Sequence, residues 1–388
     1  MRLLRLGDMM RFLIVPDKFK GCMTALEVAR AMGRGVRDAI PSADVRLIPL
    51  ADGGDGTGEI LSCGVGARRR QVGVKGPLGG RVMAGFGLDG KRAFLDMASA
   101  SGLALIPAAK RNPWQTSSFG TGQLLDAAVE AGAEQVVMGV GGSATVDGGL
   151  GMMKALGVRF LDVAGREVAD GGAGVGRVCK VELEKCVWRG RRVELIILAD
   201  VWNPLLGPFG AAPVFAPQKG ASPAMVKQLA KGLERFADVL RKQFGVKIHR
   251  LRSGGAAGGV VAGLIGVLNQ VKGVKVRVVD GIGHVLEVLQ VEDAMRKTDW
   301  VLTAEGQLDG QTARGKTIAG VASLARRCRK PVAAFAGRVA VDPGTLRRMG
   351  VRAAFPLAPG PCSLEESLKN GHDWLCRAVA NAVALIPG

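Results

Sequence analysis

The chain of 388 residues is long enough for two domains, and its hydrophobic content of 48% is ample for a sizeable core. The formal net charge of +19 lies in short basic clusters without interleaved aromatic residues, so charge alone does not indicate a nucleic-acid-binding protein. No apolar stretch reaches transmembrane length, and the seven scattered cysteines and three histidines lack disulfide or zinc-site spacing, which favours a reduced cytoplasmic protein.

Residues 11–50 predict a strand–helix–strand unit. The apolar run FLIVP forms the first strand, Thr24 and Glu27 form a capping box at the start of a helix, and VRLIPL forms the second strand after Pro41. Leu26 is expected on the apolar face of that helix. Such a crossover is nearly always right-handed and joins parallel strands.

The middle of the chain, residues 73–290, has a different character. The alternating stretch LGGRVMAGFGLDGKRAFLDM predicts antiparallel strands, and a long helix follows Ser222. The C-terminal part again predicts parallel strands at WVLTAE, PVAAFAG and GVRAAFPL, with helices at 316–328 and after Ser363. We therefore expect residues 10–72 and 291–388 to form one α/β domain, with residues 73–290 inserted as a second.

Four of the apolar runs end in a carboxylate. They are FLIVPD, RLIPLAD, LIILAD and WVLTAE, which end at Asp17, Asp52, Asp200 and Glu305. Ligands of open α/β sheets bind outside the carboxyl ends of the strands. These four acids therefore predict a site that handles cations, protons or hydroxyl groups.

The glycine-rich loop at residues 139–151, GVGGSATVDGGLG, supports two interpretations. It matches the dinucleotide pattern GxGxxA, with Asp162 further along the chain, which would suit an NAD-dependent oxidoreductase. Ser143, Thr145 and Asp147 add hydroxyl groups and a carboxylate, so a phosphate-binding or substrate-binding loop is the more economical interpretation. A simple tight turn between a strand and a helix also stays open.

Two further loops contain residue patterns that are typical of phosphate or metal binding. GQTARGKT, residues 310–317, matches the phosphate-binding Walker A pattern, although its late position argues against a P-loop fold, and Lys316 is its anion-binding candidate. In ADGGDGTGE, residues 51–59, Asp52 and Asp55 could hold Mg²⁺ through water or orient substrate hydroxyl groups. Ordinary helix starts or polar turns would also explain both loops.

The segment LADVWNPLLGPFGAAPVFAPQKGA, residues 198–221, combines an acid, an amide and a lysine. Asp200 ends a buried strand, Asn203 lies in a turn, and Lys219 lies in a later turn. We interpret these three residues as a positioned substrate site that contains a buried acid. The small residues of SGGAAGGV, at 253–260, would allow a close approach of the backbone to a ligand or to another segment.

These segments together make the chain resemble the bacterial glycerate kinase family from the first strand to the last helix. The matching stretches, in order, are PDKFKG, LADGGDGT, SSFGTGQLL, GGSATVDGGLGM, ADVWNPLLGP, FAPQKGASP, GGAAGGV, EGQLDGQTARGK and APGPCSLEES. The resemblance implies a flavodoxin-like parallel-sheet domain split by the inserted domain. It also implies ATP-dependent phosphorylation of D-glycerate, usually to 2-phosphoglycerate, in organic acid metabolism.

The chain departs from the usual family pattern at four positions. Lys18 stands where serine is common, Val146 replaces an asparagine, Trp202 replaces an acid or polar residue, and Gln307 replaces an arginine. These changes bear on substrate preference more than on the chemistry.

Phosphoryl transfer needs neutralised charge and in-line positioning, and the candidate residues divide accordingly. We expect Asp200 to be the general base, with Asp147 as an interchangeable candidate, and Lys20 to face the transferring phosphoryl group or the glycerate carboxylate. The remaining candidates are Asp17, Asp52, Asp55, Asn203 and Lys219 for the substrate, and Gly141, Gly142, Ser143, Glu305, Asp309 and Lys316 for the nucleotide. Asp52 and Asp55 are also the candidate ligands of Mg²⁺. The expected partners are ATP and D-glycerate, without nucleic acid or membrane, and a homo-oligomer stays open.

Overall fold

The protein is an α/β structure, as the sequence predicts. The computed structural model describes residues 9–309 and 317–386. It divides into two compact units, one formed by the chain up to Asp52 and from Ile282 onward, and the other by Gly53–Gly281. We call them the split unit and the inner unit. No helix within the described residues is both long and apolar enough to cross a membrane.

The boundaries of the inner unit lie earlier in the chain than the sequence suggests. Strand β3 (Arg68–Lys75) runs through the expected boundary at residues 72 and 73, and it pairs along its whole length with β4 (Arg81–Asp89). Helix α2 (Thr57–Gly64) also belongs here, because a Cβ atom on Gly58 would lie 2.5 Å from the backbone carbon of Leu95. The inner unit therefore begins at Gly53, before α2.

The split unit contains a five-stranded, fully parallel sheet. Its strands, in pairing order, are β13 (Ala353–Pro356), β12 (Val332–Val339), β11 (Trp300–Leu308), β1 (Arg11–Ile14) and β2 (Asp44–Leu47). Counted within this unit alone, the spatial order is 2-1-3-4-5, which is the flavodoxin-like order. The order reverses between β1 and β11, where ligands of such sheets bind.

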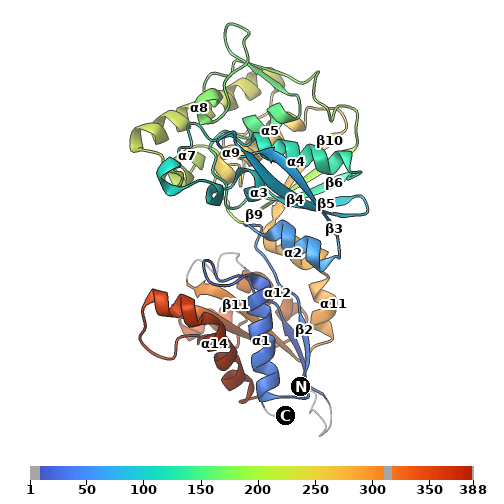
Figure 1. The fold of residues 1–388 in the computed structure, drawn as a ribbon, viewed down its shortest axis with the longest axis vertical. Helices are drawn as coiled ribbons and strands as arrows, with labels where there is room; N and C mark the ends of the chain where they lie inside the picture. The colour runs from blue at the N-terminus through green and yellow to red at the C-terminus, as the bar shows by residue number, and fades with distance from the viewer. Residues whose placement is uncertain (1–8, 310–316, 387–388) are drawn as a thin grey trace. The chain divides into compact units, whose positions relative to one another are not determined.

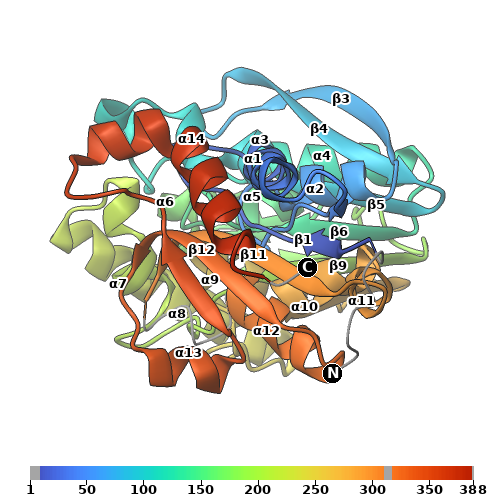
Figure 2. The ribbon, with the colours of Figure 1, turned by 90° about the horizontal axis from the view of Figure 1, so that it is seen from below.

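Helices cover both faces of this sheet. Figure 2 shows α1 (Ala25–Ala39) and α14 (Leu364–Val383) on one side of it, and α12 (Thr317–Arg327) and α13 (Pro343–Met349) on the other. Phe12 and Ile14 point into the core under α1 and α14, while Leu13 between them is equally buried. The strands are thus apolar on both faces, which explains why their sequences show no alternation. The other helices near Ile282 are α10 (Gly281–Val288) and α11 (Val291–Arg296).

The predicted helix starts are confirmed. Thr24 and Glu27 form both hydrogen bonds of the capping box of α1, and Ser363 and Glu366 do the same for α14. The prediction that Leu26 lies on the buried face of α1 was wrong, because its side chain is 42% exposed. Leu26 lies one position after the buried Ala25, which is about 100° around the helix.

The inner unit contains a six-stranded mixed sheet (Figure 1). Its strands, in pairing order, are β10 (Val274–Asp280), β9 (Val193–Ala199), β6 (Gln135–Gly139), β5 (Arg92–Asp96), β4 and β3. The first four strands are parallel, whereas β5, β4 and β3 pair antiparallel, as the alternating sequence predicts for β4 and β5. The carboxyl ends of β9, β6 and β5 therefore meet at one edge of this sheet.

Helices and one small sheet complete the inner unit. The α-helices besides α2 are α3 (Ala98–Ser101), α4 (Phe119–Glu130), α5 (Leu150–Ala155), α6 (Gly172–Val175), α7 (Ala211–Phe215), α8 (Pro223–Phe244) and α9 (Ala256–Leu268). The 3₁₀ turns are η1 (Leu103–Leu105), η2 (Ala108–Lys110) and η3 (Pro217–Lys219), and the small sheet pairs β7 (Arg159–Leu161) with β8 (Lys180–Glu182). The core includes the fully buried Trp188 and an edge-on contact between Phe160 and Phe236.

Candidate functional site

In the split unit, Asp17 lies in the turn that follows β1. Its amide donates a 2.9 Å hydrogen bond to the carbonyl oxygen of Ala304, which fixes the turn against β11. The carboxylate accepts a 2.6 Å hydrogen bond from the Thr317 hydroxyl and a 2.7 Å hydrogen bond from the Lys18 amide. Asp17 is therefore held at the place where the strand order of the sheet reverses.

The electrostatic surroundings of Asp17 are unfavourable to its charged form. Burial, followed by the negative charge of Asp52, raises the pKa of the Asp17 carboxyl to about 6, although the hydrogen bonds from Thr317 and Lys18 act in the opposite direction. Two neighbouring carboxylates, one of them only 7% exposed, form an environment that a cation would stabilise. The sequence indicated both acids, and the structure adds that they interact.

The other described candidate residues of the split unit are Glu305, Asp309 and Lys20, and they differ in burial and in hydrogen bonding. Glu305 lies within β11, opposite Ala336 of β12, and is partly buried. Asp309 follows the same strand and accepts a 3.1 Å hydrogen bond from the side chain of Gln307. Lys20 is exposed.

The Walker A-like loop lies mostly outside the described residues, and so does Lys316. Its flanks agree with the sequence interpretation, since β11 ends at Leu308 and α12 begins at Thr317. Thr317 was not among the predicted site residues. The signal was present, because Thr317 is the last residue of the GxxxxGK[ST] match.

In the inner unit, the glycine-rich loop after β6 packs against the loop that contains Asp55. A Cβ atom on Gly141 would lie 2.5 Å from Cα of Gly54, and one on Gly142 would lie 3.2 Å from Cβ of Asp55. Gly142 also has a φ angle of +70°, which side chains disfavour. Glycine is thus required where these two loops meet, and the contact brings Asp55 next to Gly142.

Lys219 and Ser143 form a buried polar contact in the same region. The Lys219 ammonium donates a 2.9 Å hydrogen bond to Oγ of Ser143 and a 2.7 Å hydrogen bond to the carbonyl oxygen of Thr145. Only 3% of Lys219 is exposed, and this burial lowers its pKa to about 7, while the negative charge of Asp147 acts in the opposite direction. The sequence indicated Lys219 but not its burial.

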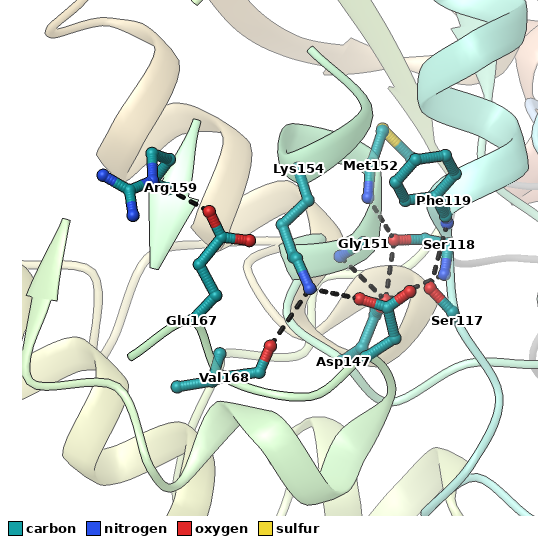
Figure 3. Close-up of polar contacts among 11 residues, drawn as sticks. Ser117, Ser118, Phe119, Asp147, Gly151, Met152, Lys154, Arg159, Glu167 and Val168 are labelled. Atoms are coloured by element: carbon teal, nitrogen blue, oxygen red, sulfur yellow. Dashed lines mark hydrogen bonds and ion pairs between the residues drawn. The ribbon is translucent and has the colours of Figure 1, made fainter. Parts of the chain in front are cut away.

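Asp147 is fully buried and accepts hydrogen bonds from four donors. Oδ2 accepts from the amide and hydroxyl of Ser118 at 2.8 and 2.7 Å and from the amide of Gly151 at 3.3 Å, and Oδ1 accepts from the amide of Gly149 at 3.1 Å. Figure 3 shows Ser118 and Gly151 directed toward this carboxylate. Burial raises the pKa of Asp147, and the four hydrogen bonds oppose that shift. Asp147 therefore joins the starts of α4 and α5, and it offers no surface to a reacting group.

The loop after β9 differs from the expectation of a buried acid. Asp200 is exposed, although β9 before it is buried. The side-chain amide of Asn203 donates a 2.8 Å hydrogen bond to the carbonyl oxygen of Phe209, and so closes its own loop. Trp202 is 59% exposed and stacks on the guanidinium of Arg252, 4.1 Å from the ring centroid. The buried charged residue of the predicted substrate segment is Lys219, not Asp200.

The segment SGGAAGGV packs between these loops. The amide of Gly255 donates a 2.9 Å hydrogen bond to the carbonyl oxygen of Asn203, and the amide of Gly148 donates a 3.2 Å hydrogen bond to that of Gly258. A Cβ atom on Gly258 would overlap the backbone of Thr145. Close packing of backbones explains the small residues here.

The dinucleotide interpretation of residues 139–151 was wrong. Strand β7, which follows α5, pairs with β8 in a separate antiparallel sheet and does not extend the sheet of β6. Asp162 accepts hydrogen bonds from the amides of Ala164 and Arg166, and so stabilises the turn after β7. A Rossmann site needs a second parallel strand that ends in the acid.

The candidate ligands of Mg²⁺ do not form an all-protein metal site. Within residues 9–309 and 317–386, no group of three or more histidine, cysteine, aspartate or glutamate side chains could hold a metal ion. Mg²⁺ commonly binds one or two carboxylates together with substrate phosphates. The interacting pair of Asp17 and Asp52 fits a site of that kind.

Comparisons with known proteins agree on one family. The family model described as Glycerate kinase family matches residues 12–387. The chain is 42% identical to a glycerate kinase of Halalkalibacterium halodurans, over 95% of this chain and 96% of that protein, and 38% identical to a glycerate 2-kinase of Escherichia coli, over 97% and 98%. A solved structure described as glycerate kinase 2 from Salmonella typhimurium LT2 superposes with a TM-score of 0.83 at 40% sequence identity. The superposition covers 97% of this chain and 98% of the chain in that structure.

Proposed function

Since this chain belongs to the glycerate kinase family, we propose that it transfers the γ-phosphoryl group of ATP to D-glycerate. The observation that carries the proposal is the family match from residue 12 to residue 387, which includes both units. A relative that is 38% identical is a glycerate 2-kinase, so we expect 2-phosphoglycerate as the product.

The reaction transfers one phosphoryl group and one proton. The 2-hydroxyl oxygen of D-glycerate attacks the γ-phosphorus, the bond between that phosphorus and ADP breaks, and the hydroxyl proton leaves to a base. We propose Asp200 as this base, because its carboxylate is exposed at the carboxyl end of β9. Asp147 is unsuited to that role, since its carboxylate is fully buried and accepts four hydrogen bonds.

Anionic groups of the substrates need donors and cations. We propose that the loop amides at Gly141, Gly142 and Ser143, together with Lys316, bind phosphate oxygens, and that Glu305 and Asp309 also belong to the nucleotide site. Lys20 would face the transferring group or the glycerate carboxylate. Asn203 and Lys219 would support the loops of the substrate site, since both side chains already donate hydrogen bonds to protein atoms.

The residues present fit a divalent cation. Mg²⁺, when bound, would neutralise phosphate charge, and Asp52 is the residue we expect to hold it, with Asp55 or Asp17 as its companion. The support is the mutual repulsion of Asp17 and Asp52, which a cation would relieve.

The test is incubation of the protein with MgATP and D-glycerate, with the products followed by phosphorus NMR. We expect ADP and a new phosphomonoester that is coupled to the proton on carbon 2. A thermal-shift measurement with MgATP and with NADH serves as the control, and only MgATP should stabilise the protein. A folded protein that is stabilised by MgATP but forms no phosphoglycerate would contradict the proposed substrate.

A further inference from the structure

Arg111 has a buried donor without an acceptor. Its Nε atom is inaccessible to solvent, and within the described parts of the chain it has no hydrogen-bond partner. An arginine side chain is always charged and carries five N–H donors. A buried donor left without an acceptor is costly, so such a group in a folded protein calls for an explanation.

The backbone places Arg111 beside Lys219. Gly220, the residue after Lys219, has a φ angle of +93°, and a Cβ atom on it would overlap the carbonyl oxygen of Arg111 and lie 3.0 Å from its Cβ. Only glycine allows this approach. Two cationic residues on two different segments are therefore neighbours in the inner unit.

The segment that begins at Arg111 is hydrogen-bonded to the candidate phosphate-binding loop, residues 139–151. The hydroxyl of Thr116 donates a 2.8 Å hydrogen bond to the carbonyl oxygen of Ala144, and Ser118 binds Asp147. Lys219 reaches the same loop through Ser143 and Thr145. The Oγ1 atom of Thr145 is a second buried polar atom that has no hydrogen-bond partner among the described residues.

The buried carboxylate of this region is already engaged by protein donors. Arg111 and Lys219 contribute two cationic groups, whereas the carboxylate next to Lys219 is Asp147, whose oxygens already accept four hydrogen bonds. A guanidinium group matches the geometry of a carboxylate or phosphoryl group, to which it can donate two parallel hydrogen bonds.

We propose that Arg111 is an anion-binding residue of the active site, and that its guanidinium pairs with a substrate oxyanion beside Ser143 and Lys219. This inference rests on the proposed kinase function, which supplies two kinds of oxyanion, the glycerate carboxylate and the phosphoryl groups of ATP. Arg111 lies outside every motif from which the site was predicted.

The experiment compares Arg111→Ala and Arg111→Lys with Lys110→Ala. Lys110 is the adjacent residue and is exposed, so its variant makes the same change in net charge without touching the inferred site. KM and kcat are measured separately for D-glycerate and for MgATP, after circular dichroism and thermal unfolding establish that each variant is folded. We expect Arg111→Ala to lower kcat/KM at least 30-fold, Arg111→Lys to recover part of that loss, and Lys110→Ala to stay within twofold of the wild type.

The pattern of the loss identifies the anion. A rise in KM for D-glycerate alone indicates the carboxylate, a rise in KM for MgATP alone indicates a bound phosphate, and a fall in kcat with both KM values unchanged indicates the group in transfer. Guanidinium ion, added below denaturing concentrations, should restore activity to Arg111→Ala if the defect is a missing cation.

Two results would overturn the inference while the wild type remains active with D-glycerate. One is a folded Arg111→Ala variant with kinetic constants within twofold of the wild type. The other applies if Arg111→Ala does not fold, and is a folded Arg111→Lys variant whose constants equal those of Lys110→Ala. An inactive wild type would instead count against the proposed function.

Discussion

The hydroxyl of Thr317 donates a 2.6 Å hydrogen bond to Oδ2 of Asp17, a residue 300 positions away in the sequence. The contact joins the turn after β1 to the first residue of α12. It therefore connects the two separate pieces of chain that form the split unit, at the point where the order of the sheet reverses. This hydrogen bond lowers the pKa of Asp17 and therefore favours the charged form of its carboxylate.

The first prediction concerns the pH dependence of activity. Thr317→Val removes a hydrogen bond that lowers the pKa of Asp17, so that pKa should rise further above about 6. If charged Asp17 is needed, the acidic limb of kcat/KM should move up by roughly half a unit to one unit. Thr317→Ser keeps the hydroxyl and should leave the limb in place. Identical pH profiles for the valine variant and the wild type would separate Asp17 from catalysis.

The second prediction concerns stability. The folded-state pKa of Asp17, about 6, lies above its ordinary value of 3.8, so the folded state binds the proton more tightly than the unfolded state does. This preference stabilises the fold at low pH and is lost as the pH rises through 6, with a full range of about 3 kcal/mol. Asp17→Asn should therefore gain stability relative to the wild type between pH 4 and pH 7.5 in urea unfolding. The exposed Asp44→Asn variant is the control, and a flat difference for Asp17→Asn would contradict the shift.

Lys219 should give the opposite slope at higher pH. Its folded-state pKa, about 7, lies below the ordinary value of 10.5, so the unfolded state holds the proton more tightly. The wild type should thus gain about 2.5 kcal/mol of stability relative to Lys219→Met between pH 6.5 and pH 9. Lys227→Met removes an exposed lysine of the same unit and should show no such trend. If both variants follow the wild type in parallel, the ammonium is less desolvated than the structure indicates.

Asp147→Asn should destabilise the protein. The asparagine would place an amide donor toward the amide of either Gly149 or Ser118, and the buried charge of Lys219 would lose its counter-charge. We expect a loss of about 2–4 kcal/mol in the free energy of unfolding. Ser118→Ala should cost less, and the double variant should cost less than the sum, because both residues belong to one hydrogen-bonded group. Strict additivity would show that the two side chains act independently.

Asp200→Asn tests the assignment of the base. Removing a general base should lower kcat by roughly 10²–10⁴-fold. The exposed position predicts a change of less than about 0.5 kcal/mol in stability. Glu184→Gln, at another exposed acid of the inner unit, should leave kcat unchanged. Activity of Asp200→Asn within tenfold of the wild type would remove Asp200 as the base.

The sequence predicted the parallel sheet of the split unit because that information is local. Its strands are short apolar runs without alternation, and its helices begin at capping boxes such as Thr24 with Glu27. The start of the inner unit at Gly53 was not predictable in the same way. The first four residues of β3 are exposed and mostly charged, so they lack the pattern of a strand, and only pairing with β4 makes them one.

The sequence names the candidate site residues, but it does not indicate how deeply each side chain is buried or which groups surround it. Lysine is rarely buried, so nothing in FAPQKGA indicates that Lys219 lies among Ser143, Thr145 and Asp147. The same tertiary packing makes Asp147 an internal anchor and leaves Asp200 at the surface.

The central place of β1 in its sheet has a consequence for biosynthesis. Its neighbour β11 leaves the ribosome roughly 15–60 s after it, at ordinary rates of translation. The nascent chain must therefore keep an apolar strand with one open edge while the whole inner unit emerges. Ribosome-bound chains in which residue 281 has left the exit tunnel and β11 has not should be cut by protease within residues 9–52 well before the inner unit is cut. Equal protection of both would show that β1 finds a temporary partner.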